Sequence, residues 1–346
     1  MLEGPEVPGR PGPGVGPPLG GSRRPSRLPD GRTLADLSED ELLAEIFPIF
    51  ASGPAALLGP GDDTALLATP DGSVVATTDT MVRDRDWRDA WSTGRDVGGK
   101  VVAQNLADVA AMGARPTGVL VTLVADPATA VDWVLEMTRG VAAACAEAGV
   151  TVLGGDLSSA PLGTLMVSVT ALGTLDGRPP VLRSGARPGD TVALAGTLGL
   201  AAAGWRLLET HRADDDAEAV ARQRCPRPPL AQGPVAATAG ATSMIDLSDG
   251  LLRDAARVAR ASRVRFALEE RALAPDVARL STALGPELAR ECVLAGGEEH
   301  SLLATFASDA SLPEGWRRVG AVSAGSGVTI DGLPERARGW DHFADR

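Results

Sequence analysis

Short acidic loops rich in Gly, Ser and Thr recur along the chain, and several of them follow segments with the alternation of a β-strand. These loops are Gly61–Thr64, Thr77–Thr80, Asn105–Asp108, Gly154–Asp156, Asp246–Gly250 and Gly296–Glu299. Ligands of α/β folds bind where strands end. Aspartates at such places, beside glycines that let another group approach the backbone, are better suited to holding hard cations than to stabilising a core. The pattern favours an α/β fold that carries out metal-dependent phosphate chemistry.

Length and charge narrow the class of protein further. With 346 residues, 44% of them hydrophobic, the chain is long enough for two α/β domains with a real core. Its 33 basic and 45 acidic residues give a net charge of -12. This charge argues against nucleic acid or an anionic membrane as the main partner, so we expect a small-molecule ligand.

The cysteines and the N-terminal segment bear on where the protein works. Cys145, Cys225 and Cys292 are an odd set without CxxC spacing, which indicates neither a disulfide framework nor a zinc site. No stretch reaches the roughly 18 consecutive apolar residues of a membrane span. The first 33 residues are rich in Pro and Gly and lack the apolar region of a signal peptide. We therefore expect a cytoplasmic protein with a disordered tail at residues 1–33.

Two capping boxes mark helix starts. Ser38 with Glu41 precedes apolar residues at helical spacing, and Thr93 with Asp96 predicts a helix that runs to about Met112. Further helices are expected at Thr129–Ala148, at Leu200–Leu208, after Ser248 or Asp249, and at Pro286–Leu294.

A turn dipeptide, Asp71-Gly72, separates two short runs with strand character, Ala65–Thr69 and Ser73–Thr78. This arrangement favours a β-hairpin. Such a hairpin would deliver Asp63 and Asp79 to opposite ends of two paired strands.

The remaining strands and the domain boundary follow from alternation and composition. Strands are expected at Val119–Ala125, Val150–Leu153, Leu165–Leu172, Thr191–Ala195, Ser243–Asp246, Arg265–Leu268, Ser301–Phe306 and Arg317–Val322. The second of these would run straight into Gly154–Asp156. The Pro-, Gly- and Arg-rich segment Asp176–Pro188 is the expected boundary, and the charged stretch His211–Pro229 is expected to be exposed. We expect an N-terminal domain at 34–178 and a C-terminal domain at 179–346, each a mixed sheet packed with helices.

The helix that starts at Thr93 carries two features of interest. Lys100, Gln104 and Asp108 are spaced four residues apart, with Asn105 beside them, so a polar stripe follows one side. The segment Gly94–Val101 resembles a phosphate-binding loop of the form GxxxxGK. We reject that interpretation because Val101 has no hydroxyl group for magnesium and no hydrophobic strand comes directly before the motif.

The acidic loops carry more weight as a set than singly. An isolated Asp in a turn usually caps a helix or closes an Asx-turn, and Asp249 could simply cap its helix. Several ionised carboxylates in one cleft repel one another unless cations lie between them. Magnesium takes one or two carboxylates together with phosphate oxygens and water, so scattered aspartates suit a bound polyphosphate. Phosphoryl transfer would then proceed by positioning and charge neutralisation.

At this point the residues resemble a known family, the thiamine-monophosphate kinases of the aminoimidazole-ribonucleotide-synthetase superfamily. The resemblance runs from about Leu37 to Phe343. The motifs that carry it are GDDTALL at Gly61, TTDTMV at Thr77, KVVAQNLADVAAMGARP at Lys100, LGGD at Leu153, VLRSGARPGD at Val181 and IDLSDGLLRDAARVARAS at Ile245.

The resemblance implies roles for individual residues. The magnesium ligands it implies are Asp63, Thr77, Thr78, Asp79, Asp108, Asp156, Asp246 and Asp249. The contacts to ATP it implies are Gly155, Asp156, Arg183 and Ser248, and the catalytic set is Asp79, Asp108 and Asp156. On the substrate side it implies Asp86, Glu298 and Trp340. Trp340 could equally be a hydrophobic plug, and Arg183 could be only a surface cation.

The resemblance further implies the superfamily's architecture, a homodimer built through the N-terminal domains, and an acceptor held between the two domains. The implied reaction is direct transfer of the γ-phosphoryl group of ATP to thiamine monophosphate, with several Mg²⁺ ions. Two departures lie on the acceptor side. Asp86 replaces a histidine that the family commonly shows, and Glu299 replaces the aspartate of a Gly-Gly-Glu-Asp loop. Three alternatives therefore remain open: a superfamily enzyme with another acceptor, a two-metal phosphohydrolase, and a nucleotide-binding paralogue without activity.

Overall fold

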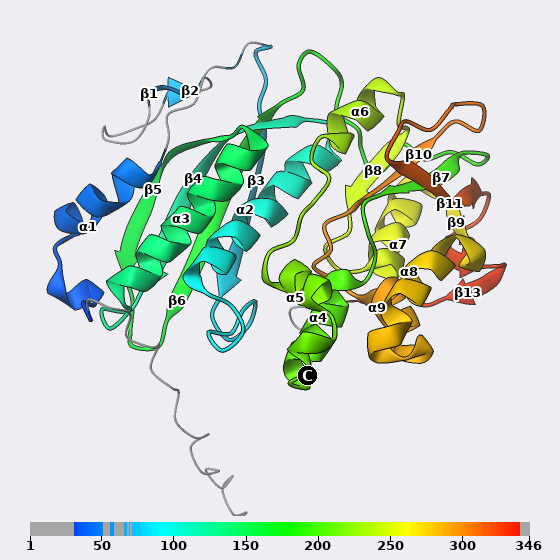
Figure 1. Ribbon diagram of the computed structural model, residues 1–346. Coiled ribbons are helices and arrows are strands. Elements are labelled where there is room, and N and C mark those ends of the chain that lie inside the picture. The colour runs from blue at the N-terminus through cyan, green and yellow to red at the C-terminus, as the bar shows by residue number, and fades with distance from the viewer. Residues whose placement is uncertain (1–30, 51–55, 59–65, 68, 70, 340–346) are drawn as a thin grey trace, which may run out of the picture.

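The computed structural model describes residues 31–50, 56–58, 66–67, 69 and 71–339. Two sheets lie side by side with helices packed against them, one built from the first half of the chain and one from the second (Figure 1). The expected α/β class, with two sheets packed with helices, is confirmed.

The first half forms a four-stranded sheet in the order β3-β6-β4-β5. Its elements, with the short pieces before it, are α1 (Glu39–Ile46), β1 (Ala56–Leu58), β2 (Leu66–Leu67), β3 (Val75–Val82), α2 (Gly94–Ala111), β4 (Arg115–Ala125), α3 (Val131–Ala148), β5 (Thr151–Ser159) and β6 (Leu165–Thr174). β4 and β5 are parallel, whereas β6 runs antiparallel to both β3 and β4. In Figure 1, α2 and α3 lie over the viewer's side of this sheet.

The second half forms a seven-stranded sheet in the order β13-β12-β9-β11-β7-β10-β8. Its elements are β7 (Thr191–Ala195), α4 (Leu200–Glu209), α5 (Ala217–Arg224), α6 (Gln232–Thr238), β8 (Ser243–Asp246), α7 (Leu251–Ser262), β9 (Arg265–Leu268), α8 (Glu270–Leu284), α9 (Pro286–Ala295), β10 (Leu302–Phe306), β11 (Trp316–Ser323), β12 (Gly327–Ile330) and β13 (Leu333–Glu335). Its pairs are antiparallel except for β12 with β9.

Helix α2 joins the two halves. It packs against α3, β3 and β6 on its own side and contacts β8 and α6 of the second half. Glycines make the contact with α3 close: a Cβ on Gly98 would lie 2.0 Å from the carbonyl oxygen of Met137, and one on Gly140 would lie 2.1 Å from that of Arg95. Because no side chain fits there, α2 is held rigidly between the sheet and the second half.

Both capping boxes are confirmed. The side chain of Ser38 accepts a hydrogen bond from the backbone of Glu41 at the start of α1, and Thr93 does the same with Asp96 at the start of α2. The segment that resembled a phosphate loop lies inside α2, which agrees with our rejection of that motif.

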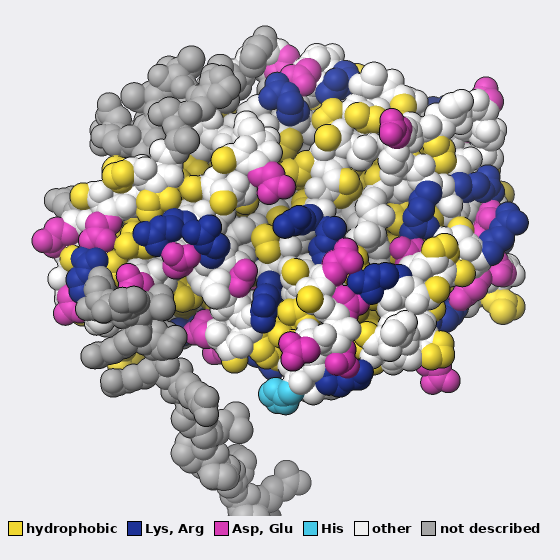
Figure 2. Space-filling view, viewed as in Figure 1, with side chains coloured by type: hydrophobic (Ala, Val, Ile, Leu, Met, Phe, Trp, Pro, Cys, Tyr) yellow, Lys and Arg dark blue, Asp and Glu magenta, His cyan; other side chains and the backbone are white. Residues whose placement is uncertain are grey.

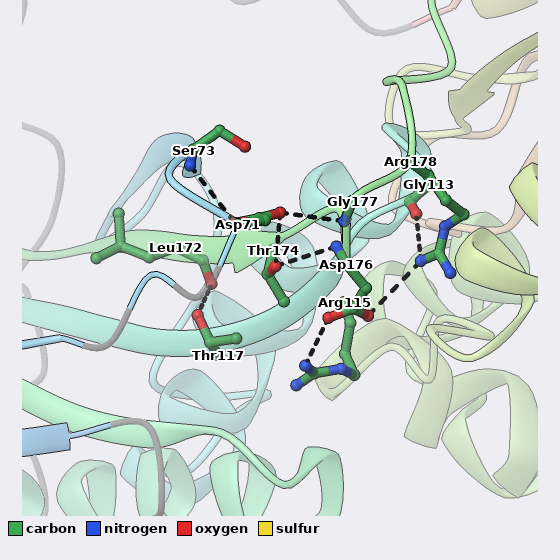
Figure 3. Close-up of polar contacts among 10 residues, drawn as sticks. All are labelled: Asp71, Ser73, Gly113, Arg115, Thr117, Leu172, Thr174, Asp176, Gly177 and Arg178. Carbon is green, nitrogen blue, oxygen red and sulfur yellow. Dashed lines mark hydrogen bonds and ion pairs between the residues drawn. The ribbon is translucent and has the colours of Figure 1, made fainter.

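The predicted hairpin is wrong, because β2 pairs with β1 and β3 pairs with β6. The turn at Gly72 does form, but polar contacts direct it elsewhere (Figure 3). The carboxylate of Asp71 accepts hydrogen bonds from the Thr174 hydroxyl at 3.1 Å and from the backbone N–H of Gly177 at 3.3 Å. These bonds anchor the turn to the end of β6, and eight residue pairs then form between β3 and β6. The position of Asp63 lies outside the described residues.

The remaining strand predictions are confirmed to within four residues at their ends, and β7, β8 and β9 have the predicted bounds; the exception is β5. That strand continues through Gly154–Asp156 to Ser159, with an irregular register at Leu153, so these residues do not form a loop after the strand. The charged stretch 211–229 was also only partly predicted. It contains α5, whose Ala219, Val220 and Gln223 are buried. The strands β12 and β13 and the helices α6 and α8 were not predicted.

In the part of the chain that the structure describes, no helix combines the length and apolar character needed to cross a membrane.

Candidate active site

The structure brings Asp79 and Asp108 together at the face between β3 and α2. The Thr77 hydroxyl donates to Oδ2 of Asp108 at 3.0 Å, which ties the strand to the helix. One turn earlier on α2, the side-chain oxygen of Asn105 accepts the backbone N–H of Asp79 at 2.9 Å. The buried amide of Asn105 is itself held by the carbonyl oxygen of Val101 at 2.7 Å. The polar stripe predicted on this helix therefore positions Asp79, which lies within β3 and not, as expected, in a loop after a strand.

The raised pKa values of these carboxylates indicate that their negative charges are not fully neutralised by the neighbouring side chains. Burial raises the pKa of Asp108 to about 7, and the nearby carboxylates of Asp246 and Asp79 add to the rise. Burial likewise raises the pKa of Asp79, with Asp246 and Glu298 contributing. No Lys or Arg among the described residues lies within ion-pair distance of Asp79 or Asp108. Such a cluster ionises fully only when cations enter it.

Asp246 reaches this cluster from the end of β8 with a histidine partner. Nδ1 of His300 lies 3.1 Å from Oδ2 of Asp246, and both side chains are buried. Burial alone would lower the pKa of His300, but the hydrogen bond to Asp246 and the charges of Asp246, Glu298 and Asp108 outweigh it and raise the pKa. Within the described residues, Nε2 of His300 has no hydrogen-bond partner. Sequence reasoning missed His300, although its place directly after two glutamates was a usable signal.

Glu298 is held by the single lysine of the chain. Nζ of Lys100, a nearly buried group, lies 2.6 Å from Oε2 of Glu298 and donates to the carbonyl oxygen of Asp86 at 3.2 Å. The neighbouring Glu299 is used differently. It is buried, and its carboxylate accepts hydrogen bonds from the Thr197 hydroxyl and from the backbone N–H of Ala201 in the first turn of α4. Glu298 thus belongs to the cleft, whereas Glu299 anchors the loop.

Asp249, a predicted metal ligand, lies among basic side chains. Its Oδ2 is paired with Nη2 of Arg257, and Nε of Arg253 lies 3.7 Å away. It does not cap α7 through its side chain, because the N-terminal cap is Gly250 and no side chain caps the helix. The backbone N–H groups of Asp249 and Gly250 donate to the carboxylate of Asp254. Asp254 is fully buried and shares Arg257 with Asp249.

Asp156 lies on the other face of the four-stranded sheet from Asp79. Across the sheet, Asp156 aligns with Thr122, Ser168 and Thr80, and cross-strand partners share a face. Asp79 precedes Thr80 and therefore points to the opposite face. Asp156 is exposed and accepts a hydrogen bond from the Ser158 hydroxyl at 3.0 Å. Within this one chain, the structure does not bring Asp156 into the cluster of Asp79, Asp108 and Asp246.

The other predicted nucleotide contacts are also spread out. Gly155 packs so closely on β4 that a Cβ would lie 1.7 Å from the carbonyl oxygen of Val121. Thr78 points to the same open face as Asp156 and donates to the carbonyl oxygen of Val169 at 3.0 Å. Ser248 precedes the first turn of α7 and its carbonyl oxygen accepts the N–H of Glu298 at 2.8 Å, so Ser248 adjoins the cleft.

Arg183 lies far from the carboxylate cluster, and the carboxylate of Asp86 is bonded within its own turn. Arg183 is exposed, and its carbonyl oxygen accepts from Ser262 at the far end of α7 from Ser248. That helix has 12 residues, so the two positions are about 18 Å apart along its axis. The carboxylate of Asp86 accepts the N–H of Val82 at 2.7 Å and closes the turn after β3.

Trp340 lies outside the described residues, but the residue before it does not. A Cβ on Gly339 would lie 2.1 Å from the carbonyl oxygen of Asp249, so the end of the described chain is packed against the start of α7. Among the described residues, no group of three or more His, Cys, Asp or Glu side chains is arranged to hold a metal ion by itself. A cation here would need ligands from outside these side chains, such as phosphate oxygens and water.

Comparisons with known proteins first define a class. Residues 61–175 match the family model described as AIR synthase related protein, N-terminal domain. The matched residues include β3, which carries Asp79, and α2, which carries Asp108.

Individual relatives narrow the class. The chain is 42% identical over 318 residues to a thiamine-monophosphate kinase of Mycobacterium tuberculosis, covering 90% of this chain and 94% of that protein. The crystal structure of thiamine-monophosphate kinase from Stenotrophomonas maltophilia is 30% identical, with a TM-score of 0.72 and coverage of 86% and 96%. A structure described as AaThiL complexed with AMPPCP and TMP is 28% identical, with a TM-score of 0.73 and coverage of 89% and 98%. The chain belongs to the thiamine-monophosphate kinase family.

Proposed function

We propose that this chain transfers the γ-phosphoryl group of ATP to thiamine monophosphate and so forms thiamine diphosphate and ADP. The observation that carries the proposal is the convergence of Asp79, Asp108 and Asp246, from β3, α2 and β8, in one cluster where burial and mutual repulsion raise the pKa of Asp79 and Asp108. Family membership supports the same conclusion, and the related structure complexed with AMPPCP and TMP supports binding of both a nucleotide and an acceptor.

The residues of the cluster suit Mg²⁺, because hard oxygen ligands and uncompensated negative charge are what this ion requires. We propose that Asp79, Asp108, Asp246 and Thr77 share several Mg²⁺ ions with phosphate oxygens and water, and that Thr77 and His300 fix the orientations of Asp108 and Asp246. When bound, Mg²⁺ neutralises charge on the transferring phosphoryl group. The further ligands that we keep as proposals are Asp63, Thr78, Asp156 and Asp249.

The chain's own groups have a limited chemical task. The acceptor is a phosphate that is mostly ionised at neutral pH, so transfer needs no strong general base. The cleft has to align the two phosphates and exclude water. Lys100 holds Glu298 at the edge of this cleft, which supports Glu298 as an acceptor contact. We propose Asp86 and Trp340 on the same side and Gly155, Arg183 and Ser248 as ATP contacts, as the resemblance implies.

Assembly and location extend the proposal. We propose a homodimer formed through the open face of the four-stranded sheet, where Leu120 is 38% exposed among hydroxyl side chains. This face also carries Thr78 and Asp156, so a dimer would bring those residues from two chains close to each other. We keep the domain boundaries at 34–178 and 179–346 as part of the proposal. A reducing cytoplasm is consistent with Cys145, Cys225 and Cys292, all of which are free.

The decisive experiment identifies the products. The full chain is incubated with Mg-ATP and thiamine monophosphate, and the mixture is analysed by mass spectrometry. We expect thiamine diphosphate and ADP in equal amounts, with little phosphate released when the acceptor is left out. Rapid phosphate release from Mg-ATP alone would identify a phosphohydrolase instead. ATP binding in calorimetry without any thiamine product would identify a nucleotide-binding paralogue.

A further inference from the structure

A cleft lies on the far side of α2 from the carboxylate cluster. Its volume is about 1020 Å³, and it is formed by α2, α3, the end of α5 and the segment that leads from α5 to α6. In Figure 1 these elements border the seam between the two halves, and Figure 2 shows dark-blue basic side chains near the middle of the same face. A volume of this size is typical of a site for a small organic molecule.

The floor and one wall of this cleft are apolar. Ala103 and Leu106 of α2, Ala144 of α3, and Pro228 and Leu230 of the connecting segment line it. An apolar lining of this kind can pack against the face of a planar ring.

Arginines line the opposite side. Arg222, Arg224 and Arg227 are all lining residues, and none of them has a carboxylate within 4.0 Å among the residues that the structure describes. Arg222 donates only to the carbonyl oxygen of Arg227, at 3.1 Å. The buried Nε of Arg224 has no hydrogen-bond partner in the described part of the chain. The two other lining arginines, Arg95 and Arg115, are paired with Glu136 and Asp176.

Arginines elsewhere in the described ranges are of both kinds: Arg279 and Arg290 are paired with Asp216 and Glu270, whereas exposed arginines such as Arg260 have no ion pair. The three arginines of this cleft differ from these exposed ones because they line one concave site together. A guanidinium group binds phosphate through two parallel hydrogen bonds, and a buried donor without a partner is costly to maintain. The cleft does contain carboxylates, Glu147, Glu218 and Asp96, but Glu218 is paired with Arg279 and Asp96 accepts the bonds that cap α2.

We propose that this cleft is a binding site for a small organic phosphate, with the phosphate on Arg224 and Arg227 and a planar ring on the apolar floor. The site is distinct from the carboxylate cleft, and its existence does not depend on the proposed kinase activity. It is also connected to that cleft through α2. Gly99 lines the arginine cleft, whereas the next residue, Lys100, holds Glu298 on the other side.

Chelation separates the two clefts experimentally. Without divalent ions, the carboxylates around Asp79 and Asp108 repel phosphate, whereas arginines need no metal. The full chain is therefore titrated with adenosine monophosphate in EDTA by calorimetry, with inorganic phosphate as a parallel arm. We expect adenosine monophosphate to bind more tightly than phosphate, because only the former can use the apolar floor. Equal affinities would overturn the ring part of the proposal, and no binding in EDTA would overturn the site.

Two variants assign the binding to the arginines. The double variant Arg224→Gln/Arg227→Gln is expected to bind adenosine monophosphate about tenfold or more weakly, since hydrogen bonds between charged groups are lost. The matched control is Arg260→Gln, which changes an exposed arginine in the last turn of α7, just as Arg224 lies in the last turn of α5. Thermal unfolding confirms that each variant is folded, and Arg224→Lys tests the fork geometry if the double variant is not. Unchanged affinity in a folded arginine variant would overturn the proposal.

Discussion

Two groups of partly or fully buried aspartates lie close together in this protein, and they differ in what neutralises them. Asp249 and Asp254, at the start of α7, share Arg257. Asp79 and Asp108 have no Lys or Arg within ion-pair distance among the described residues, and burial raises their pKa values, that of Asp108 to about 7, although the charge of His300 opposes the rise. The pKa of Asp254 is raised to about 7 as well, so the contrast lies in the ion pairs. Acids that carry their own counter-ion are complete without a ligand, whereas acids that lack one require something from solution. The difference distinguishes structural carboxylates from functional ones within one chain.

Isosteric changes in the unpaired group should have the largest effect. Asp79→Asn and Asp108→Asn each remove a negative ligand and keep the shape, so we expect turnover to fall by about 10³-fold, the scale on which loss of transition-state charge stabilisation is measured. Turnover is measured as thiamine diphosphate formed from Mg-ATP and thiamine monophosphate. Asp84→Asn is the matched control, because Asp84 is exposed in the turn after β3 and its positive φ of 65° suits asparagine. Near-normal turnover in both cluster variants would contradict the assigned roles.

Both Mg²⁺ and pH should change the free energy of unfolding through Asp79 and Asp108. A carboxyl whose pKa rises from 3.8 to about 7 on folding binds its proton more tightly in the folded state. The free energy of unfolding of Asp108-containing, metal-free protein should therefore fall as the pH rises from about 4 to about 7, and Mg²⁺ added at pH 7 should restore it. The melting temperature in EDTA and in Mg²⁺ across this range checks the expectation.

A variant decides whether the cluster causes that dependence. Asp108→Asn should flatten the metal-free profile and weaken the response to Mg²⁺. It should not remove the dependence fully, because burial also raises the pKa of Asp254 to about 7. An unchanged profile in Asp108→Asn would show that Asp108 is not the group that titrates.

How much of this structure the sequence could predict depends on how far apart in the chain the interacting residues lie. Local signals predicted local structure well: the capping boxes at Ser38 and Thr93 and the strand Ser243–Asp246 were found because each lies within a few consecutive residues. The hairpin failed because the choice of strand partner for β3 depends on Asp71 bonding to Thr174, about a hundred residues away.

The site shows the same division. The polar stripe on α2 and the acid at the end of β8 follow from spacing along the chain. Asp108 and Asp246 could therefore be predicted as site residues from the sequence. The pairing of Asp249 with Arg257 could not be predicted, because it depends on side-chain rotamers. The hydrogen bond between His300 and Asp246 could not be predicted either, because the two residues are 54 positions apart in the sequence. The face on which Asp156 lies depends on the irregular register at Leu153, which no local pattern indicates.

The paired group should respond mainly in stability. Arg257→Gln leaves Asp249 and Asp254 without their shared cation, so we expect the free energy of unfolding to fall by about 1–3 kcal/mol, less than for a fully buried pair because Arg257 is partly exposed. Urea unfolding monitored by circular dichroism measures the change. Arg253→Gln is the comparison, since Arg253 lies farther from Asp249, at 3.7 Å, and should cost less. An Arg257 variant as stable as the unaltered chain would remove the basis for calling this group structural.

The sharpest test compares Asp249, from the paired group, with Asp246, which lies beside Asp79 and Asp108, and it should give the smallest effect where the structure shows pairing with arginine. Asp249→Asn keeps the shape beside Arg257, and we expect turnover at saturating Mg²⁺ to change by less than about tenfold, whereas Asp246→Asn should approach the loss in Asp79→Asn. The Mg²⁺ concentration for half-maximal rate should move only in the Asp246 variant. If Asp249→Asn instead raises that concentration and lowers turnover as much as Asp246→Asn does, Asp249 leaves Arg257 to bind the metal during turnover. In that case the ion pair with Arg257 holds Asp249 near the metal site, because a carboxylate oxygen can exchange a guanidinium group for a divalent ion without a change in the backbone.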